Sequence, residues 1–296
     1  MKLTILGTGS ACPTIDRNHS ATALNIGPET LLFDCGESTQ LQLTKAGISH
    51  SKISKIFLTH WHGDHMLGLP GLLQSMELNK RAKKPLNIYG PAGSKDRFRK
   101  LVSALDIKLS FKVNVTELKA GAFNSEKYSI IVANASHHDA CISYAFQEKD
   151  HVRVDIGYLK KFGLKNHPII GDLAKGKDII WNKKKIKAKD ATKIEKGKRF
   201  AYVLDSAYAE NLVKLAKDSD VLLCESTFAD ELKDSAKKFG HMTARDAATL
   251  AKKAGAKKLI ITHFSQRYKD VSVLLREAKS VFKGTIAAKD LMEIEL

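Results

Sequence analysis

The residues with the clearest chemical potential lie in one short segment, residues 60–65, with the sequence HWHGDH. This segment offers four potential metal ligands in six positions, directly after an apolar run that ends at Thr59. His60 and His62 alternate along the chain, so an extended backbone can direct both imidazoles to the same side. Asp64 and His65 can then turn toward a second ion. Imidazole and carboxylate ligands without thiolate are typical of a hydrolytic zinc site that keeps positions open for water.

Three more potential ligands, His137, Asp205 and His263, lie at or just beyond predicted strands. Residues 55–60 and 258–263 share one pattern, in which a Lys and three apolar residues precede Thr and His. Both segments indicate a buried strand that delivers a histidine at its carboxyl end, where α/β proteins place their chemistry. Asp205 follows the apolar run 201–204, and a carboxylate there could bridge two cations. Each residue alone is explained by capping or by a hydrogen bond near a strand end, but together with segment 60–65 they favour a metal site.

The elements that must position these residues alternate between short apolar runs and helical patterns, which indicates a layered α/β fold. Predicted strands cover residues 2–6, 31–34, 55–59, 86–89, 129–133, 142–146, 200–204, 220–224 and 258–262. Predicted helices cover about residues 67–80, 94–104, 208–218, 243–254 and 270–280. The helix from Thr243 is the best signalled, because Thr243 can cap it and Gly255 can end it.

Residues 151–198 break this pattern, since they show no long amphipathic period. Basic residues crowd the second half of the stretch, beginning with Lys183, Lys184 and Lys185. We therefore expect a single domain over residues 1–296 that carries residues 151–198 as an inserted basic arm. A solvated loop is the simpler alternative for such a charged run.

Charge and length narrow the class of protein. The 296 residues hold 49 Lys and Arg against 32 Asp and Glu, a formal net charge of +17. Such an excess attracts polyanions, with nucleic acid before membrane surfaces. Aromatic residues make up only 7%, so most of the core must come from Leu, Ile, Val and Ala. The length is enough for one large core or two small ones.

The chain also offers indications of its compartment. No apolar run reaches the roughly 18 residues that cross a bilayer, and residues 1–7 resemble a first strand more than a signal peptide. The four cysteines (Cys12, Cys35, Cys141 and Cys224) have no C-x-x-C spacing. Free thiols in a reducing cytoplasm are therefore expected, with no membrane partner.

The pattern H-x-H-x-D-H, followed by a later His, Asp and His, resembles the metallo-β-lactamase superfamily. The resemblance implies an αβ/βα sandwich with two Zn²⁺ ions per subunit at the shared edge of its sheets. It assigns His60, His62 and His137 to one ion and Asp64, His65 and His263 to the other, with Asp205 bridging them. His138 is an alternative to His137, although the spacing to Tyr144 favours His137.

Five segments resemble the tRNase Z branch of that superfamily and together span nearly the whole chain. They are LGTGSACPT at 6–14, RNHS at 17–20, FDCGESTQ at 33–40, ESTF at 225–228 and HMTA at 241–244. The resemblance implies an endoribonuclease that removes the 3′ trailer of precursor tRNA, leaving a 3′-hydroxyl on the tRNA and a 5′-phosphate on the trailer. It gives Asp64 a second role as proton acceptor, brings His241 to the scissile phosphate, and makes Glu225 orient His241.

The basic arm also resembles that family. Residues 168–176, PIIGDLAKG, match its P-x-x-G-x-L-x-x-G element, although His167 stands where the family usually has Gly. The resemblance implies that Pro168, Gly171 and Gly176 grip the tRNA elbow, and we expect Lys183, Lys184 and Lys185 to contact phosphates. It also implies a homodimer in which the arm of one subunit serves the active site of the other.

Two other readings use the same residues. A small-molecule phosphodiesterase, thioesterase or lactonase would need the metal ligands, but not the arm or the pair of Glu225 and His241. A protein that binds RNA without cleaving it would be expected to have lost a ligand, yet all seven candidates are present.

Overall fold

The computed structural model describes residues 1–79, 84–137 and 139–296. The chain divides into two compact units. The first contains residues 1–124, 130–146 and 199–296, and the second contains residues 125–129 and 147–198. The predicted arm of residues 151–198 therefore falls within the second unit.

The first unit is built on two seven-stranded sheets, with the orders β20-β1-β3-β4-β5-β6-β7 and β19-β17-β16-β15-β10-β9-β8. Their strands are β1 (Lys2–Gly7), β3 (Ala21–Ile26), β4 (Glu29–Phe33), β5 (Ile53–Phe57), β6 (Leu86–Gly90), β7 (Val113–Glu117), β8 (Gly121–Asn124), β9 (Tyr128–Asn134), β10 (Ile142–Glu148), β15 (Arg199–Val203), β16 (Val221–Glu225), β17 (Leu259–Thr262), β19 (Thr285–Ala287) and β20 (Met292–Glu295). Two short strands, β2 (Gly9–Ser10) and β18 (Phe264–Ser265), pair with each other beside them.

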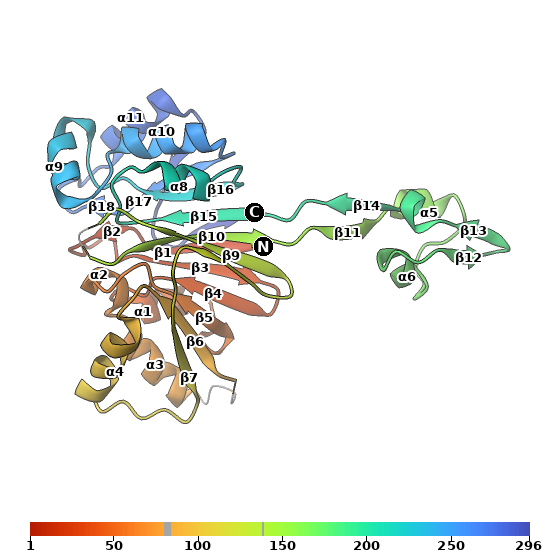
Figure 1. Ribbon diagram of the computed structural model, residues 1–296, viewed down its shortest axis with the longest axis horizontal. Coiled ribbons are helices and arrows are strands. Elements are labelled where there is room, and N and C mark those ends of the chain that lie inside the picture. Colours follow the sequence, from red (N-terminus) through yellow and green to blue (C-terminus); the bar gives the residue numbers. More distant parts are fainter. Residues whose placement is uncertain (80–83, 138) are drawn as a thin grey trace. The chain divides into compact units, whose positions relative to one another are not determined.

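Helices cover the outer side of each sheet (Figure 1). On the side of the first sheet lie α1 (Thr39–Lys45), α2 (Gly63–Met66), α3 (Leu69–Leu78), α4 (Ser94–Ala104) and the short 3₁₀ turn η1 (His50–Lys52). On the side of the second lie α8 (Glu210–Leu215), η2 (Asp230–Leu232), α9 (Lys233–Phe239), α10 (Ala244–Ala254) and α11 (Ser272–Val281). The predicted αβ/βα sandwich is confirmed.

The core has two kinds of layer. Aliphatic residues fill the space between helices and sheets, as the composition predicts. Aromatic residues, although few, gather between the two sheets, where Phe33 of β4 packs against Tyr144, Phe200 and Tyr202 of the second sheet at ring distances of 5.4 to 6.0 Å. Their large rings fill a layer that both sheets bury.

Each sheet contains parallel strands whose carboxyl ends lie at the same edge of the sheet. In the first sheet β4, β5 and β6 run parallel, and in the second β15, β16 and β17 run parallel. The carboxyl ends of parallel neighbours meet at one edge of a sheet, so residues just beyond these strands gather there.

The predicted elements agree with the structure where the apolar pattern is strong. Helix α10 has the expected Thr243 cap, completed by Asp246 as a capping box, and ends at Gly255 in a left-handed conformation. The predicted helix 67–80 corresponds to α3, which begins at Leu69 and ends at Leu78, and residue 80 lies outside the described residues. Strands β3 and β7 were not predicted. Polar residues interrupt the apolar pattern of β3, and β7 is a partly exposed edge strand.

The second unit has a small hydrophobic core of its own that includes Leu159, Leu164 and Leu173. Its elements are β11 (His151–Val154), α5 (Ile156–Lys160), α6 (Ile170–Ala174), β12 (Ile179–Trp181), β13 (Lys184–Ile186), α7 (Ala188–Ala191) and β14 (Thr192–Glu195). β11 pairs with β14, and β12 with β13. Asn182 and Lys183 both have positive φ, as the tight turn of a two-residue hairpin requires. These pieces are too short for a long amphipathic period, which explains why the sequence shows none.

All four cysteines are free, as expected. Among the described helices, none has the length and apolar character needed to cross a membrane.

Candidate active site

The seven candidate ligands all lie in loops that follow strands or in the short helix α2 that follows one of these loops. His60 follows β5, and His62, Asp64 and His65 lie at the start of α2. His137 follows β9. Asp205 and His263 follow β15 and β17, which are separated by one strand in the second sheet. Both sheets therefore contribute residues to one edge of the sandwich.

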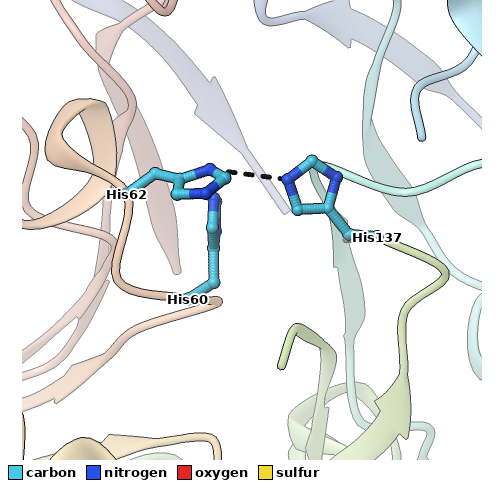
Figure 2. A group of neighbouring side chains, drawn as sticks. All are labelled: His60, His62 and His137. Atoms are coloured by element: carbon cyan, nitrogen blue, oxygen red, sulfur yellow. Dashed lines mark hydrogen bonds between the residues drawn. The ribbon is translucent and has the colours of Figure 1, made fainter. Parts of the chain in front are cut away.

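Three imidazoles form the first group. Atoms of His60, His62 and His137 that could hold an ion all lie within 4.8 Å of one another. His62 Nδ1 is 3.4 Å from His137 Nε2, and Figure 2 shows the His60 ring directed toward this pair. Three imidazoles that converge in this way fit a divalent ion such as zinc.

A second group of ligand atoms lies next to the first. Asp64, His65 and His263 also have such atoms within 4.8 Å of one another. Asp205 Oδ2 lies 2.9 Å from His65 Nε2 and 3.2 Å from His263 Nε2, while Asp205 also groups with His60 and His65. A carboxylate shared between the two groups in this way is placed to bridge two ions.

Buried polar atoms without well-aligned hydrogen-bond partners test whether an ion fits here. Among the described residues, such atoms at this site are His60 Nε2, His65 Nε2, His263 Nε2 and Asp205 Oδ2. Orphaned buried polar atoms are costly unless something satisfies them. All four belong to the two groups, so the residues present fit divalent metal binding.

The outward-facing ring nitrogens are each occupied. Partners are Thr59 Oγ1 for His60 Nδ1 (3.0 Å), Asp139 Oδ2 for His62 Nε2 (2.7 Å), Asp34 Oδ2 for His65 Nδ1 (2.8 Å), the Gly240 carbonyl for His137 Nδ1 (3.4 Å) and Thr227 Oγ1 for His263 Nδ1 (2.9 Å). Such outer contacts fix the tautomer and the ring orientation of metal-binding histidines. The inner nitrogens are thereby left facing the ion positions.

Three loop residues of the site adopt left-handed backbone conformations. Asp34, Asp205 and His263 have φ values of 55°, 48° and 59°. Non-glycine residues rarely adopt this region, and they concentrate at functional sites when surrounding structure holds them. Gly36 serves the same loop, because a Cβ there would lie 2.3 Å from the Asp64 carbonyl oxygen. Only glycine lets the loop after β4 pass so close to segment 60–65.

Histidines and carboxylates of the site lie close together, and each group shifts the pKa values of its neighbours. Burial lowers the pKa of His60 to about 2, with the neighbouring His65 adding to the shift, so His60 is a neutral imidazole. Burial acts against ionisation of Asp64 and Asp205, yet the adjacent histidines hold both pKa values well below the usual range. Burial lowers the pKa of His65, but the charges of Asp205, Asp64 and Asp34 raise it well above its usual range, so His65 holds a proton in the absence of an ion. A divalent ion would take the place of that proton, because deprotonated carboxylates and neutral imidazoles are the forms that bind metal ions.

His241 stands beside these groups and is held by Glu225. Its Nδ1 lies 3.2 Å from Glu225 Oε1 and 3.8 Å from Asp205 Oδ1. Although burial lowers its pKa, the charge of Glu225 and the hydrogen bond to it raise the pKa of His241 to about 9. Glu225 is fully buried and also accepts hydrogen bonds from Ser206 N, Thr227 Oγ1 and Met242 N. The pair is therefore rigid, and Nε2 of His241 is left to interact with a substrate.

Other expectations about the site have a structural outcome. Trp61 turns away from the ligands, and its indole N–H donates to Ser94 Oγ at 2.8 Å. His138, the alternative to His137, lies outside the described residues. The predicted RNA-binding residues Pro168, Gly171, Gly176, Lys183, Lys184 and Lys185 all lie in the second unit and are exposed.

Sequence reasoning missed two carboxylates. Asp34 is fully buried and accepts from His65, from Thr59 and from the hydroxyl of Tyr202 at 3.0 Å. Its position at the end of an apolar strand, inside the FDCGESTQ segment, was a usable signal. Asp139 lies two residues beyond His137 in the chain, and no sequence signal pairs it with His62.

Comparison with known proteins adds a family to this geometry. Residues 1–154 match the family model of the anti-Pycsar protein Apyc1, and residues 191–264 match that of the beta-lactamase superfamily domain. The ribonuclease Z of Methanothermobacter thermautotrophicus is 41% identical over 298 residues, covering 100% of this chain and 97% of that protein. This chain belongs to the ribonuclease Z family.

Further relatives agree over the full length. The ribonuclease Z of Nitrosopumilus maritimus is 38% identical, with 100% of both chains covered. The crystal structure of human tRNase Z, short form, is 30% identical, covers 100% of this chain and 99% of its own, and superposes with a TM-score of 0.74. The predicted family and fold are confirmed.

Proposed function

We propose that this protein is a zinc-dependent endoribonuclease that removes the 3′ trailer of precursor tRNA. The observation that carries the proposal is the position of His241, fixed by the buried Glu225, beside two adjacent groups of metal ligands. A phosphodiesterase needs positive charge next to the phosphate and a group that donates a proton to the leaving oxygen. Metal ions held by the two ligand groups would provide the first, and His241 would provide the second. Full-length relatives named ribonuclease Z, at 32–41% identity, support the same activity.

The metal ligands are proposed as His60, His62 and His137 for one zinc ion and Asp64, His65 and His263 for the other, with Asp205 between them. Two divalent ions bound there would supply a nucleophile near neutral pH and offset the negative charge of the phosphate.

Two side chains would handle protons. His241 presents Nε2 to the substrate because Nδ1 is held by Glu225, and it would donate a proton to the leaving 3′ oxygen of the tRNA. Asp64 Oδ2 accepts a hydrogen bond from the Ala11 N–H at 2.8 Å, which fixes the carboxylate in place. Asp64 would accept the proton of the attacking water. The products would be a tRNA with a 3′-hydroxyl and a trailer with a 5′-phosphate.

The second unit is proposed to bind the body of the tRNA. Residues 147–198 hold 15 Lys and Arg against 7 Asp and Glu, so this stretch has a net charge of +8 out of +17 for the chain. Pro168, Gly171 and Gly176 would contact the tRNA elbow, and Lys183, Lys184 and Lys185 its phosphates. Structured RNA is recognised mainly through backbone and shape, which suits an exposed basic surface. A homodimer and a cytoplasmic location stay predictions, the first testable by light scattering.

The decisive experiment is cleavage of a 5′-labelled precursor tRNA by the purified, zinc-loaded protein. A single cut at the 3′ end of the tRNA body, blocked by a chelator and restored by Zn²⁺, is the expected result. His62→Ala and Asp205→Ala should abolish the cut and lower the zinc content, while His50→Ala, at a half-buried histidine outside the site, should change neither. Hydrolysis of small diesters without tRNA cleavage would favour the small-molecule phosphodiesterase instead.

A further inference from the structure

The positive charge of the first unit is concentrated on a small part of its surface. This unit holds 33 Lys and Arg against 24 Asp and Glu, a net charge of +9. Three short segments, residues 214–220, 252–258 and 279–283, carry +6 of that charge, because they contain eight lysines and two aspartates. All eight lysines are exposed: Lys214, Lys217, Lys252, Lys253, Lys257, Lys258, Lys279 and Lys283. The rest of the first unit is close to neutral.

Hydrogen bonds hold the three segments side by side. The Lys257 N–H donates to the Ser219 carbonyl at 2.8 Å, and the Leu259 N–H donates to the Gly284 carbonyl at 3.1 Å. The segments lead into β16, β17 and β19, which run parallel as neighbours in the second sheet. Neighbouring strands lie about 4.8 Å apart, so the lysines form one continuous surface, which we call the basic edge.

Helix ends explain only half of these lysines. Four of them lie in the last turns of α8, α10 and α11, where positive charge is favourable beside the carboxyl end of a helix. The other four follow the helices. Lys257 forms an ion pair with Asp220 at 2.8 Å, whereas Lys217, Lys258 and Lys283 form none with any described residue. The charges of these three lysines are therefore available to an external anion.

The basic edge lies at the amino ends of its strands, opposite the candidate active site. β17 leads from Lys258 at the basic edge to His263 at the metal-ligand groups, and its four residues span about 13 Å at roughly 3.3 Å each. A phosphate bound at the basic edge is therefore not the one that the same site would cut. The proposed reaction makes no use of this surface.

The composition of the basic edge favours RNA as its partner over a membrane or a protein. Surfaces that bind membranes combine basic residues with exposed apolar ones, and interfaces between proteins are enriched in aromatic residues. Among the described residues, none of the exposed large hydrophobic side chains belongs to the three segments. Exposed lysines without apolar neighbours suit a phosphate backbone.

We propose that the basic edge is a second RNA-binding surface, which holds the phosphate backbone of double-helical RNA. Contacts from lysine to phosphate supply affinity and salt dependence but carry no sequence information. The surface goes beyond the proposed function, because it lies away from the metal ligands and does not depend on cleavage.

The test measures binding of a short, blunt RNA duplex to the full-length, zinc-loaded protein by fluorescence anisotropy across a potassium chloride series. The duplex has neither a trailer nor a tRNA elbow. The combined variant Lys217→Gln, Lys258→Gln and Lys283→Gln should weaken binding about tenfold. It should also make the slope of log affinity against log salt shallower by roughly 0.9 for each lysine that contacts a phosphate.

A matched control removes the same charge elsewhere on the first unit. The combined variant Lys45→Gln, Lys52→Gln and Lys112→Gln changes three exposed lysines on the side of the first sheet. It should leave the affinity and the slope nearly unchanged. Hydrolysis of bis(p-nitrophenyl) phosphate should be unchanged in both variants, because neither set of lysines contacts the metal ligands.

The possible outcomes separate this surface from its alternatives. Equal loss of duplex binding in both variants would mean that overall charge, rather than the basic edge, attracts the RNA. Unchanged duplex binding with lost binding to phosphatidylserine vesicles would make the basic edge a membrane-binding surface, and either result would overturn the proposal. Cleavage of precursor tRNA by the unmodified protein tests the proposed function separately. Duplex binding that depends on the basic edge would stand even if that cleavage failed.

Discussion

Buried acceptors behind the histidines decide which ring nitrogens face the ion positions. Asp34 is the clearest case, since it is fully buried and accepts from the backbone and hydroxyl of Thr59 as well as from His65. With its Nδ1 proton held by Asp34, His65 keeps Nε2 as an electron-pair donor. The same logic applies to His263 and Thr227.

Asp34→Asn should lower zinc affinity by roughly 10- to 100-fold, because the amide removes the charge and replaces an acceptor oxygen with a donor. Competition with a fluorescent zinc chelator measures this change. Asp290→Asn is the matched control, since Asp290 also accepts several hydrogen bonds but from Thr8, Asn18 and Gln42. A lower melting temperature with unchanged zinc affinity in Asp34→Asn would reduce Asp34 to a structural role.

His241→Ala should lower turnover on precursor tRNA by about 10²- to 10⁴-fold, the range for a positioned proton donor. The loss on bis(p-nitrophenyl) phosphate should be much smaller, because p-nitrophenolate leaves without needing a proton. Steady-state kinetics on the two substrates, together with tRNA affinity and zinc content, give the comparison. An equal loss on both substrates would contradict proton donation to the leaving oxygen.

At the scale of elements, parallel strands bring residues that are distant in the sequence to one edge of the sheet. The second unit has a small hydrophobic core of its own. β15, β16 and β17 place Asp205, Glu225 and His263 at successive strand ends. In the second unit, β11 and β14 pair from His151↔Glu195 to Val154↔Thr192. Because β11 and β14 are paired, the residues between them can be replaced by a tight turn that still connects the two strands.

Replacing residues 155–191 by Asn-Gly should preserve the β11–β14 hairpin, because this dipeptide favours the tight turn between paired strands. We expect weaker binding of precursor tRNA and unchanged hydrolysis of bis(p-nitrophenyl) phosphate. Gel-shift titration and the small-diester assay measure the two effects. Equal loss in both assays would mean that the arm supports the fold of the first unit.

At the scale of the whole molecule, charge is distributed unevenly along the chain. Residues 147–198 contribute +8 of the +17 net charge. Long-range attraction of a polyanion depends on such an excess and weakens as salt screens it. Binding of tRNA should therefore be far more sensitive to salt than binding of zinc.

Affinity for precursor tRNA should fall with salt along a log–log slope of roughly −0.9 for each phosphate neutralised on a duplex. The arm-deleted variant should show a shallower slope than the intact protein. Filter binding across a potassium chloride series measures both. Identical slopes would place the phosphate contacts on the first unit rather than on the arm.

The chain itself determined the types and spacing of the ligands, because segment 60–65 places four of them within six residues and the remaining three follow apolar strands. The sequence also indicated the basic arm, because the charge of a segment follows from its residue types and does not depend on the fold. Strands such as β3 and β7 could not be predicted because pairing, rather than local pattern, stabilises them.

Tertiary structure alone decided how these residues are oriented. The bond between His62 and Asp139 joins residues 77 positions apart, and that between Tyr202 and Asp34 joins residues 168 apart. Contacts of this kind depend on how two sheets pack, which local spacing does not encode. The same packing left the inner histidine nitrogens facing one another. The physical reason is that ligand identity is a property of single residues, whereas ligand geometry is a property of the closed sandwich.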